Sequence, residues 1–313
     1  MKKFASKIVF LFLTLALSVS IFAQSKESKD ETYIKIAKLT QSKKAEDADR
    51  AYQMSKDFLA KFGKDDDEKT KKIRAFSDNY RNNAFNKRLD EVKTAEAFTI
   101  GKEILAQEPE NIYVTMNLAY AGFDAQQKNK DKSFGADSVS YAKQTLALID
   151  AGKLPKTFTP FKDQAEATAF MYYVIGNFSL DSNTKAAAYN FYKAVGYESK
   201  IKTDSFPYYA IAANYEKEYA KQATEYQTKF AAKTTEDDEM KVAQAKLDKI
   251  IGNMLDAYAR AIKHGEAEKN PQLVAWKQRF AEVYKFLKKS DAGMNEYLAS
   301  QPNTPLPDPT AAL

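Results

Sequence analysis

The chain has 313 residues, carries 48 basic and 42 acidic side chains, and contains no cysteine. The absence of cysteine excludes disulfides, thiolate chemistry, thiolate metal sites and a lipid-modified N-terminal cysteine. Basic and acidic residues alternate along the chain, as they do on solvated helix faces. Nucleic-acid binding needs clusters of Lys and Arg that neutralise phosphates, so the sequence predicts no nucleic-acid partner.

The first 23 residues have the layout of a signal peptide. Lys2, Lys3 and Lys7 form a basic start, residues 8–17 are apolar, and Ala23 is a small residue before a polar one. The apolar stretch is shorter than the roughly 20 residues that span a bilayer. The pattern therefore predicts a secretory signal cleaved after Ala23, with an uncleaved anchor as the competing interpretation.

The predicted cleavage also changes the net charge of the chain. Because the signal holds three of the 48 basic residues and none of the acidic ones, the remaining chain has 45 basic against 42 acidic residues. No later segment is apolar enough to cross a membrane. We therefore expect an exported protein, periplasmic or secreted, with no integral membrane span after signal cleavage.

The rest of the chain predicts an all-α fold. Glycines and prolines number only 10 and 9, and the period-two alternation typical of strands is nowhere sustained. Gly63, Gly152, Gly196 and Gly265 follow apolar helical runs, where C-terminal caps are expected. The predicted helices cover residues 31–40, 45–62, 67–89, 93–107, 112–127, 137–150, 162–180, 184–196, 206–232, 236–263, 271–288 and 292–300.

The flanking segments differ in composition from this helical region. Residues 24–30 are polar and are predicted to be flexible, and the proline-rich residues 301–313 are predicted to be a disordered tail. We therefore predict that residues 31–300 form one helical domain.

Residues 172–195 have a spacing typical of a helix hairpin, with small residues where two helices cross and larger ones beside them. These residues are Tyr172, Ile175, Gly176, Ala188, Tyr192 and Val195. Their order resembles the signature of the tetratricopeptide repeat (TPR), a 34-residue helical hairpin, although Ser179 stands where an aromatic residue is usual. The resemblance implies a degenerate TPR-like solenoid, a right-handed superhelical array of antiparallel helix hairpins.

One predicted hairpin is much longer than a TPR unit. Residues 206–232 and 236–263 would form helices of about 40 Å each, at 1.5 Å per residue. We therefore expect one elongated hairpin in the array.

The sequence offers little catalytic chemistry. His264 is the only histidine, and its place before Gly265 favours a helix-capping or exposed side chain. Asp65, Asp66 and Asp67 lack the spacing of a calcium loop and favour a helix start. Glycine-rich phosphate loops and hydrolase motifs are missing. We therefore predict no catalytic residue, no cofactor and no metal site.

The aromatic residues are the remaining candidates for function. In the TPR family, the inner faces of the first helices of each hairpin line a groove for partners. The resemblance therefore implies a partner-binding groove at Tyr173, Asn177, Tyr209 and Asn117. The lysines that accompany such asparagines in family members that clamp a carboxylate are not evident, so we do not expect that specificity.

These observations favour an exported, non-catalytic TPR-like scaffold that binds a protein or peptide partner in the bacterial cell envelope or outside it. Two alternatives remain. One is an enzyme that acts on wall glycans with carboxylates distant in sequence. The other is an elongated structural spacer.

Overall fold

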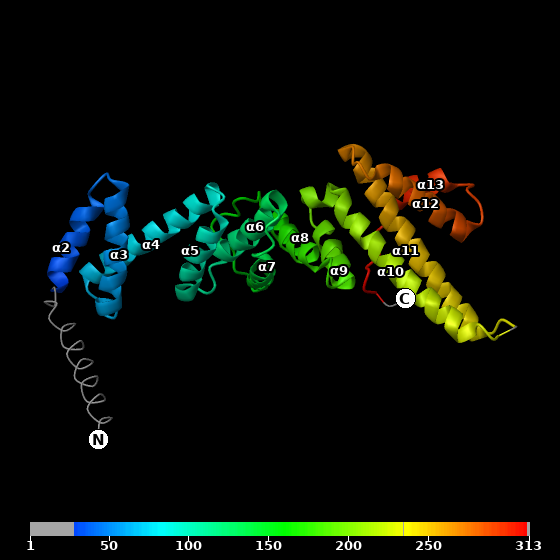
Figure 1. Ribbon diagram of the computed structural model, residues 1–313, viewed down its shortest axis with the longest axis horizontal. Helices are drawn as coiled ribbons and strands as arrows, with labels where there is room; N and C mark the ends of the chain where they lie inside the picture. The colour runs from blue at the N-terminus through cyan, green and yellow to red at the C-terminus, as the bar shows by residue number, and fades with distance from the viewer. Residues whose placement is uncertain (1–27, 234, 312–313) are drawn as a thin grey trace, which may run out of the picture. The chain divides into compact units, whose positions relative to one another are not determined.

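In a computed structural model, which describes residues 28–233 and 235–311, the chain is built from α-helices and short 3-10 turns (Figure 1). No strand occurs in these residues, and the predicted all-α class is confirmed. The expected signal peptide, its cleavage site after Ala23 and most of the predicted flexible N-terminus lie outside the described residues. None of the described helices combines the length and apolarity of a membrane span.

The described part of the chain divides into two compact units, with the boundary between Ala84 and Phe85. The first contains α2 (Lys29–Thr40), α3 (Ala45–Phe62) and most of α4 (Glu68–Asp90). Ser28 caps α2, since its hydroxyl accepts from the backbone N–H of Glu31 while the Glu31 carboxylate accepts from the Ser28 N–H. The small core of this unit is formed by Ile36, Ala51, Phe58 and Ile73.

The second unit begins with the end of α4 and contains the remaining helices. Its first part has α5 (Thr94–Gln107), α6 (Ile112–Asn129), α7 (Gly135–Asp150), α8 (Gln164–Ser179), α9 (Thr184–Val195) and the 3-10 turn η1 (Lys200–Thr203). Its second part has α10 (Ser205–Phe230), α11 (Asp238–Glu268), α12 (Leu273–Lys288), α13 (Met294–Ser300) and the 3-10 turn η2 (Gln301–Asn303).

From α5 to α12, each helix packs against the next one in the chain, and α6 also contacts α8. Polar N-caps define where several of these helices begin. Asn111, Asp163, Asn183 and Asp237 each accept a hydrogen bond from a backbone N–H in the first turn of the following helix. The predicted starts of these helices, at residues 112, 162, 184 and 236, lie within two residues of the observed ones.

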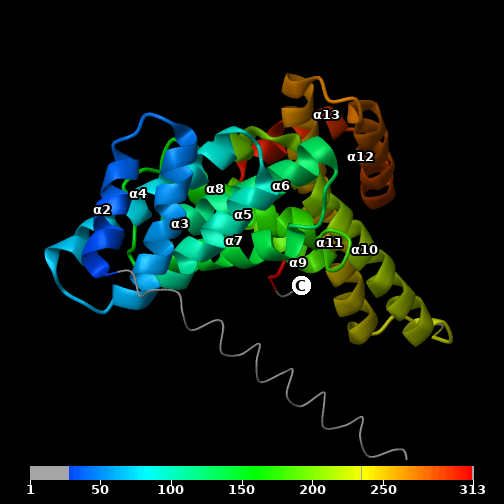
Figure 2. The same cartoon turned by 60° about the vertical axis from the view of Figure 1, so that its left-hand side comes forward.

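The predicted elongated hairpin is present as α10 and α11, which lie side by side in both views (Figures 1 and 2). They have 26 and 31 residues, and at 1.5 Å per residue they are about 39 and 46 Å long. Their facing sides form one apolar core with α9 and α12, in which Ile211, Tyr215, Ile250 and Leu255 are buried.

The predicted end of α11 near residue 263 was wrong. The helix continues to Glu268, so His264 and Gly265 lie inside it. Gly265 is buried, and a Cβ atom at this position would lie 2.9 Å from Cζ3 of Trp276 on α12. This glycine therefore permits the close approach of a neighbouring helix. The other three glycines do follow helix ends, at the C-termini of α3, α7 and α9.

The C-terminal segment makes more contacts than its composition suggested. Residues 301–311, for which the sequence predicts disorder, return to α11 (red in Figure 1). The Arg260 guanidinium donates hydrogen bonds to backbone carbonyls of this segment, and Pro309 is buried. Residues 301–303 of this proline-rich segment form η2, and the carbonyls of Gln301 and Thr304 accept hydrogen bonds from Arg260 of α11.

Candidate binding site

Both tyrosines of the predicted groove contact aromatic side chains on other helices. On α8, Tyr173 packs edge-on against Phe123 and Phe191, with ring centroids 5.6 and 5.5 Å apart. On α10, Tyr209 stacks on Trp276 at 5.1 Å. Each ring therefore contributes to packing between helices.

The two asparagines of the predicted groove have different surroundings. Asn177 lies one turn after Tyr173 on α8 and is half-buried. Asn117 on α6 is only 4% exposed. Its amide nitrogen donates to the backbone carbonyl of Tyr113, at 2.9 Å, and to that of Thr159, at 3.2 Å. Asn117 thus joins α6 to the loop that precedes α8.

A pocket of about 140 Å³ lies beside Asn117, and we call it the α6 pocket. Its walls come from the end of α4, the turn after it, the start of α5, the Thr159-Pro160 loop and one face of α6. The α6 face contributes Tyr113, Asn117, Tyr120, Ala121 and Asp124. These positions follow the three- and four-residue spacing that places side chains on one side of a helix.

The volume of the α6 pocket limits what it can hold. An engineered cavity of about 150 Å³ accommodates a benzene-sized group, whereas drug-sized ligands occupy pockets of about 300–1,000 Å³. The α6 pocket is therefore suited to one side chain of a partner.

Polar groups at fixed positions line the α6 pocket. The Tyr113 hydroxyl donates to Oδ1 of Asn86 at 3.0 Å, and burial together with the charge of Asp90 raises its pKa. Asp124 is paired with Lys128 at 3.0 Å. The Tyr120 ring packs against Phe170, which holds that wall of the pocket.

The turn after α4 has an unusual backbone conformation where it lines the α6 pocket. Val92 has φ of 55°, in the left-handed region that β-branched residues rarely adopt. Its side chain is 44% exposed. The surrounding fold therefore holds a strained residue at the rim of the pocket.

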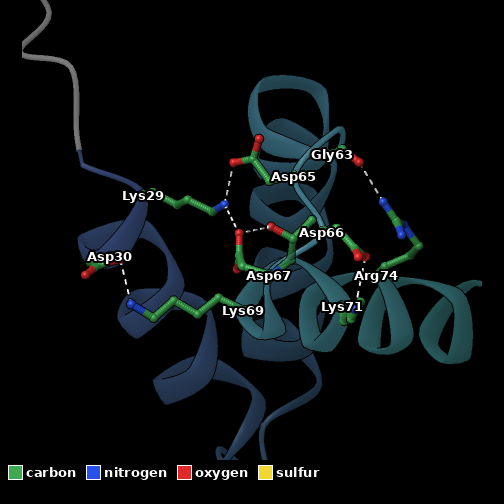
Figure 3. Close-up of polar contacts among 10 residues, drawn as sticks. Lys29, Asp30, Gly63, Asp65, Asp66, Asp67, Lys69, Lys71 and Arg74 are labelled. Atoms are coloured by element: carbon green, nitrogen blue, oxygen red, sulfur yellow. Dashed lines mark hydrogen bonds and ion pairs between the residues drawn. The ribbon is translucent and has the colours of Figure 1, made fainter.

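The acidic run at residues 65–67 forms a helix start, as predicted (Figure 3). Asp67 caps α4, because its carboxylate accepts from the backbone N–H of Thr70 at 3.0 Å. Lys29 donates to both Asp65 and Asp67 and lowers the pKa of Asp67. Asp66 pairs with Lys71 at 2.9 Å.

In Figure 3 these carboxylates therefore face lysines from α2 and α4. Two further contacts hold the same region. Lys69 pairs with Asp30 at 2.7 Å, and Arg74 donates to the carbonyl of Gly63 at 2.6 Å. Across the described part of the chain, no group of three or more His, Asp or Glu side chains could hold a metal ion.

The interpretation of His264 as a helix cap or exposed residue was wrong. Its ring stacks on Tyr208 of α10, with centroids 5.1 Å apart. Burial and the neighbouring charge of Lys263 lower the pKa of the imidazole. The residue is a packing element between the two long helices.

A polar cluster that the sequence did not reveal joins the start of α10 to the end of α11. The Glu268 carboxylate accepts from the backbone N–H of Ser205 at 2.9 Å and from its hydroxyl. Asp204 caps α10 by accepting from the N–H of Phe206, and it is hydrogen-bonded to the Tyr173 hydroxyl. Burial and the charge of Glu268 raise the pKa of Asp204.

Sequence spacing could not identify this cluster, because Ser205 and Glu268 are 63 residues apart. The α6 pocket has a partial signal in the sequence. Its α6 residues recur at helical spacing and combine tyrosines with Asn117 and Asp124, whereas the residues from α4 and the Thr159-Pro160 loop carry no such pattern.

No protein-family model, curated protein or solved structure matches this chain. The resemblance to the TPR family therefore rests on the six positions between Tyr172 and Val195.

Proposed function

We propose that this protein is an exported, non-catalytic TPR-like scaffold that binds a protein or peptide partner in the bacterial cell envelope or outside it. The observation that carries the proposal is the α6 pocket. It has room for one side chain, it offers hydrogen-bonding groups at fixed positions, and it includes Asn117 from the predicted groove. A partner would insert an anchoring side chain there, as in interfaces with a few dominant contacts.

The packing of the helices supports the architectural part of the proposal. Each helix from α5 to α12 contacts the next one in the chain. This is the contact pattern expected of a right-handed array of antiparallel helix hairpins, in which every unit touches its neighbours. Such arrays present extended surfaces to partners. The signal-like first 23 residues support export.

Site-specific crosslinking tests the binding function. A photoreactive amino acid replaces Asp90, which is exposed at the rim of the α6 pocket, or Gln227, which is exposed on α10. In native envelopes, a defined partner should crosslink from position 90 and not from position 227. That partner, once purified, should bind wild-type protein more tightly than Ala121→Leu by at least about tenfold, or 1.4 kcal/mol.

The Ala121→Leu variant is chosen because Ala121 lines the pocket, so a larger side chain fills it while the polar groups stay in place. Equal crosslinking from positions 90 and 227 would contradict the proposal. The same holds if the purified partner binds Ala121→Leu as tightly as the wild type.

One observation favours keeping the wall-glycan enzyme as a second candidate. The α6 pocket brings together Asp90 and Asp124, two carboxylates that are distant in sequence. Paired carboxylates of this kind carry out glycoside hydrolysis in many enzymes. Purified protein would then release soluble fragments from wall glycan, and Asp90→Asn and Asp124→Asn would each abolish the release. Absence of turnover by the wild type would remove this candidate.

A further inference from the structure

Both N–H groups of the Asn117 amide are hydrogen-bonded inside the fold. The side chain is 4% exposed, and its nitrogen donates to the backbone carbonyls of Tyr113 and Thr159. Two carbonyl acceptors fix which side of the amide carries the nitrogen. The amide oxygen accepts no hydrogen bond from residues 28–233 and 235–311, so the side chain keeps one unused acceptor.

The unused oxygen of Asn117 lies at the wall of the α6 pocket. It is not one of the fully buried unpaired atoms of the described chain, so solvent reaches it, and Asn117 lines the pocket. An amide oxygen accepts hydrogen bonds and cannot donate them. A ligand that displaces water from it without replacing the hydrogen bond binds less well. The pocket therefore favours a ligand that brings a donor to this position.

The charged side chains in the pocket lining favour a cation. They are Arg88, Asp90 and Asp124. Arg88 pairs with Glu91 and Glu96, which lie outside the lining. Asp90 is exposed at the rim and has no ion-pair partner within the described ranges of the chain. An anionic ligand would meet these carboxylates as like charges, whereas a cationic ligand is attracted by them.

Asp124 is the more enclosed of the two carboxylates. Its side chain is 17% exposed, and that of Lys128, its partner one turn later, is 57% exposed. Lys128 contacts Oδ2, and no residue in the described part of the chain forms a hydrogen bond or ion pair with Oδ1. Exposed ion pairs of this kind contribute little to stability. The carboxylate can therefore accept a second cation from inside the pocket.

Asn117 and Asp124 are two turns apart on one face of α6. Seven residues at 1.5 Å per residue separate them by about 10 Å along the helix axis. A ligand that satisfies both side chains needs a donor at each end of a stem, with the positive charge at the Asp124 end. A lysine residue has this form, with a backbone N–H at one end of its four-carbon stem and an ammonium at the other.

Two tyrosines on the same face of α6 suit such a stem. Tyr113 lies one turn before Asn117, and Tyr120 lies between Asn117 and Asp124 in the sequence. Both rings are held in place, Tyr113 by the hydrogen bond from its hydroxyl and Tyr120 by its contact with Phe170. Aromatic rings pack against methylene groups and attract a nearby ammonium.

We propose that the α6 pocket receives a lysine residue of the partner, with the ammonium on Asp124 and the backbone N–H on the Asn117 oxygen. The inference rests on the proposed function, because it names the anchoring side chain. An arginine fits less well, since its planar guanidinium carries five donors and needs more acceptors than the Asp124 end of the pocket supplies.

A single lysine residue, Nα-acetyl-lysine N-methylamide, is the probe. It is titrated into full-length protein while NMR follows the backbone amides of α6. These shifts should saturate with the probe and not with its Nε-acetyl derivative, which lacks the charge. The arginine analogue and n-butylammonium, which has no backbone N–H, should each bind at least about threefold more weakly. Ala121→Leu, which fills the pocket, should abolish the saturable shifts.

Two variants change the charge beside the bound ammonium in opposite directions. Asp124→Asn should weaken binding of the lysine probe at least about fivefold, and Lys128→Gln, which removes the competing cation, should tighten it at least about twofold. Asp238→Asn makes the same charge change at a fully exposed side chain on α11 and should leave the affinity unchanged. Lys128 is exposed, so Lys128→Gln keeps the test decisive even if Asp124→Asn does not fold.

Several results would overturn the inference. These are absence of saturable shifts with the lysine probe, equal binding of the probe and n-butylammonium, tighter binding of the arginine analogue, and an affinity that is indifferent to Lys128→Gln. Crosslinking from position 90 decides the proposed function separately. A partner that crosslinks there while the lysine probe does not bind would leave the scaffold proposal standing and remove only the lysine site. Probe binding with the expected charge dependence, but without a crosslinked partner, would support the lysine site and contradict the scaffold proposal.

Discussion

Gly176 on α8 lies against the ring of Phe191 on α9, so that a Cβ atom at position 176 would come within 3.0 Å of Cε1 of that ring. The close helix crossing expected from this glycine is therefore present, and the nearest atoms belong to Phe191. Ala188, the other small residue of the predicted crossing, is completely buried in the core that also contains Phe191.

Ala188→Phe should destabilise the protein by roughly 1–3 kcal/mol, because the larger ring overpacks a filled core. If each helix pair interacts mainly with its neighbours, the loss of stability should be confined to the region around α8 and α9. Amide hydrogen exchange should accelerate in α8 and α9 while α12 keeps its protection. Gln227→Glu, at an exposed position on α10, should change stability by less than about 0.5 kcal/mol. Unchanged exchange in α8 and α9 would show that the crossing is not close.

Tyr173→Ala and Tyr209→Ala distinguish packing residues from groove residues. Because both rings contact aromatic partners on other helices, each truncation should lower the free energy of unfolding by about 2–4 kcal/mol. Tyr173→Phe and Tyr209→Phe keep the ring and should cost much less. Chemical denaturation measures both pairs. If the Ala variants keep wild-type stability but lose a captured partner, the tyrosines belong to a groove.

Asp204→Asn should raise stability at neutral pH relative to the wild type. Burial raises the pKa of Asp204, so the folded chain binds this proton more tightly than the unfolded chain. Ionisation of this carboxylate therefore lowers the free energy of unfolding. The loss begins as pH rises above the usual Asp pKa of about 3.9 and is complete above the raised pKa of the folded chain. Asparagine removes the charge and still caps the helix.

The gain of Asp204→Asn should accordingly shrink when unfolding is measured near pH 3. Asp204→Ala is the matched control, because it removes the cap to the Phe206 N–H as well and should cost about 1 kcal/mol more than the Asn variant at either pH. A loss of stability in Asp204→Asn at pH 7 would mean that the ionised carboxylate stabilises the fold.

Val92→Gly should stabilise the protein by about 1 kcal/mol. The left-handed conformation costs a residue with a side chain roughly 1–2 kcal/mol, and glycine adopts it freely, although glycine gains more entropy in the unfolded state. Thermal unfolding of the variant against wild type measures the difference. Val92→Ala, which keeps a Cβ atom, is the control and should gain less. Equal stability of all three chains would show that the turn stores no strain.

The helices were predictable because their signals are local. Apolar spacing runs along each helix, and Gly63, Gly152 and Gly196 directly follow the helices whose ends they mark. The end of α11 was misjudged because a glycine after an apolar run also suits a helix contact. Only the position of Trp276 in space shows that Gly265 has that second role.

The candidate sites were predictable only in part, for a related reason. Asn117 was selected in the sequence and does line a pocket, but the walls from α4 and the Thr159-Pro160 loop come from other parts of the chain. The same applies to Glu268 at the start of α10 and to Arg260 beneath the tail. In these last two cases the hydrogen-bonded partners are more than 40 residues apart, and no local pattern relates them.

The hold of Arg260 on the C-terminal segment also bears on the order in which the protein is completed during synthesis. The acceptor carbonyls lie 41 to 44 residues after the arginine. A ribosome adds about 5–20 residues each second. The residues that carry these acceptor carbonyls are therefore added about 2–9 s after Arg260. During that interval Asp256 is its partner on α11. The buried polar groups in the C-terminal part of α11 are therefore fully paired only after residues 301–304 have been added.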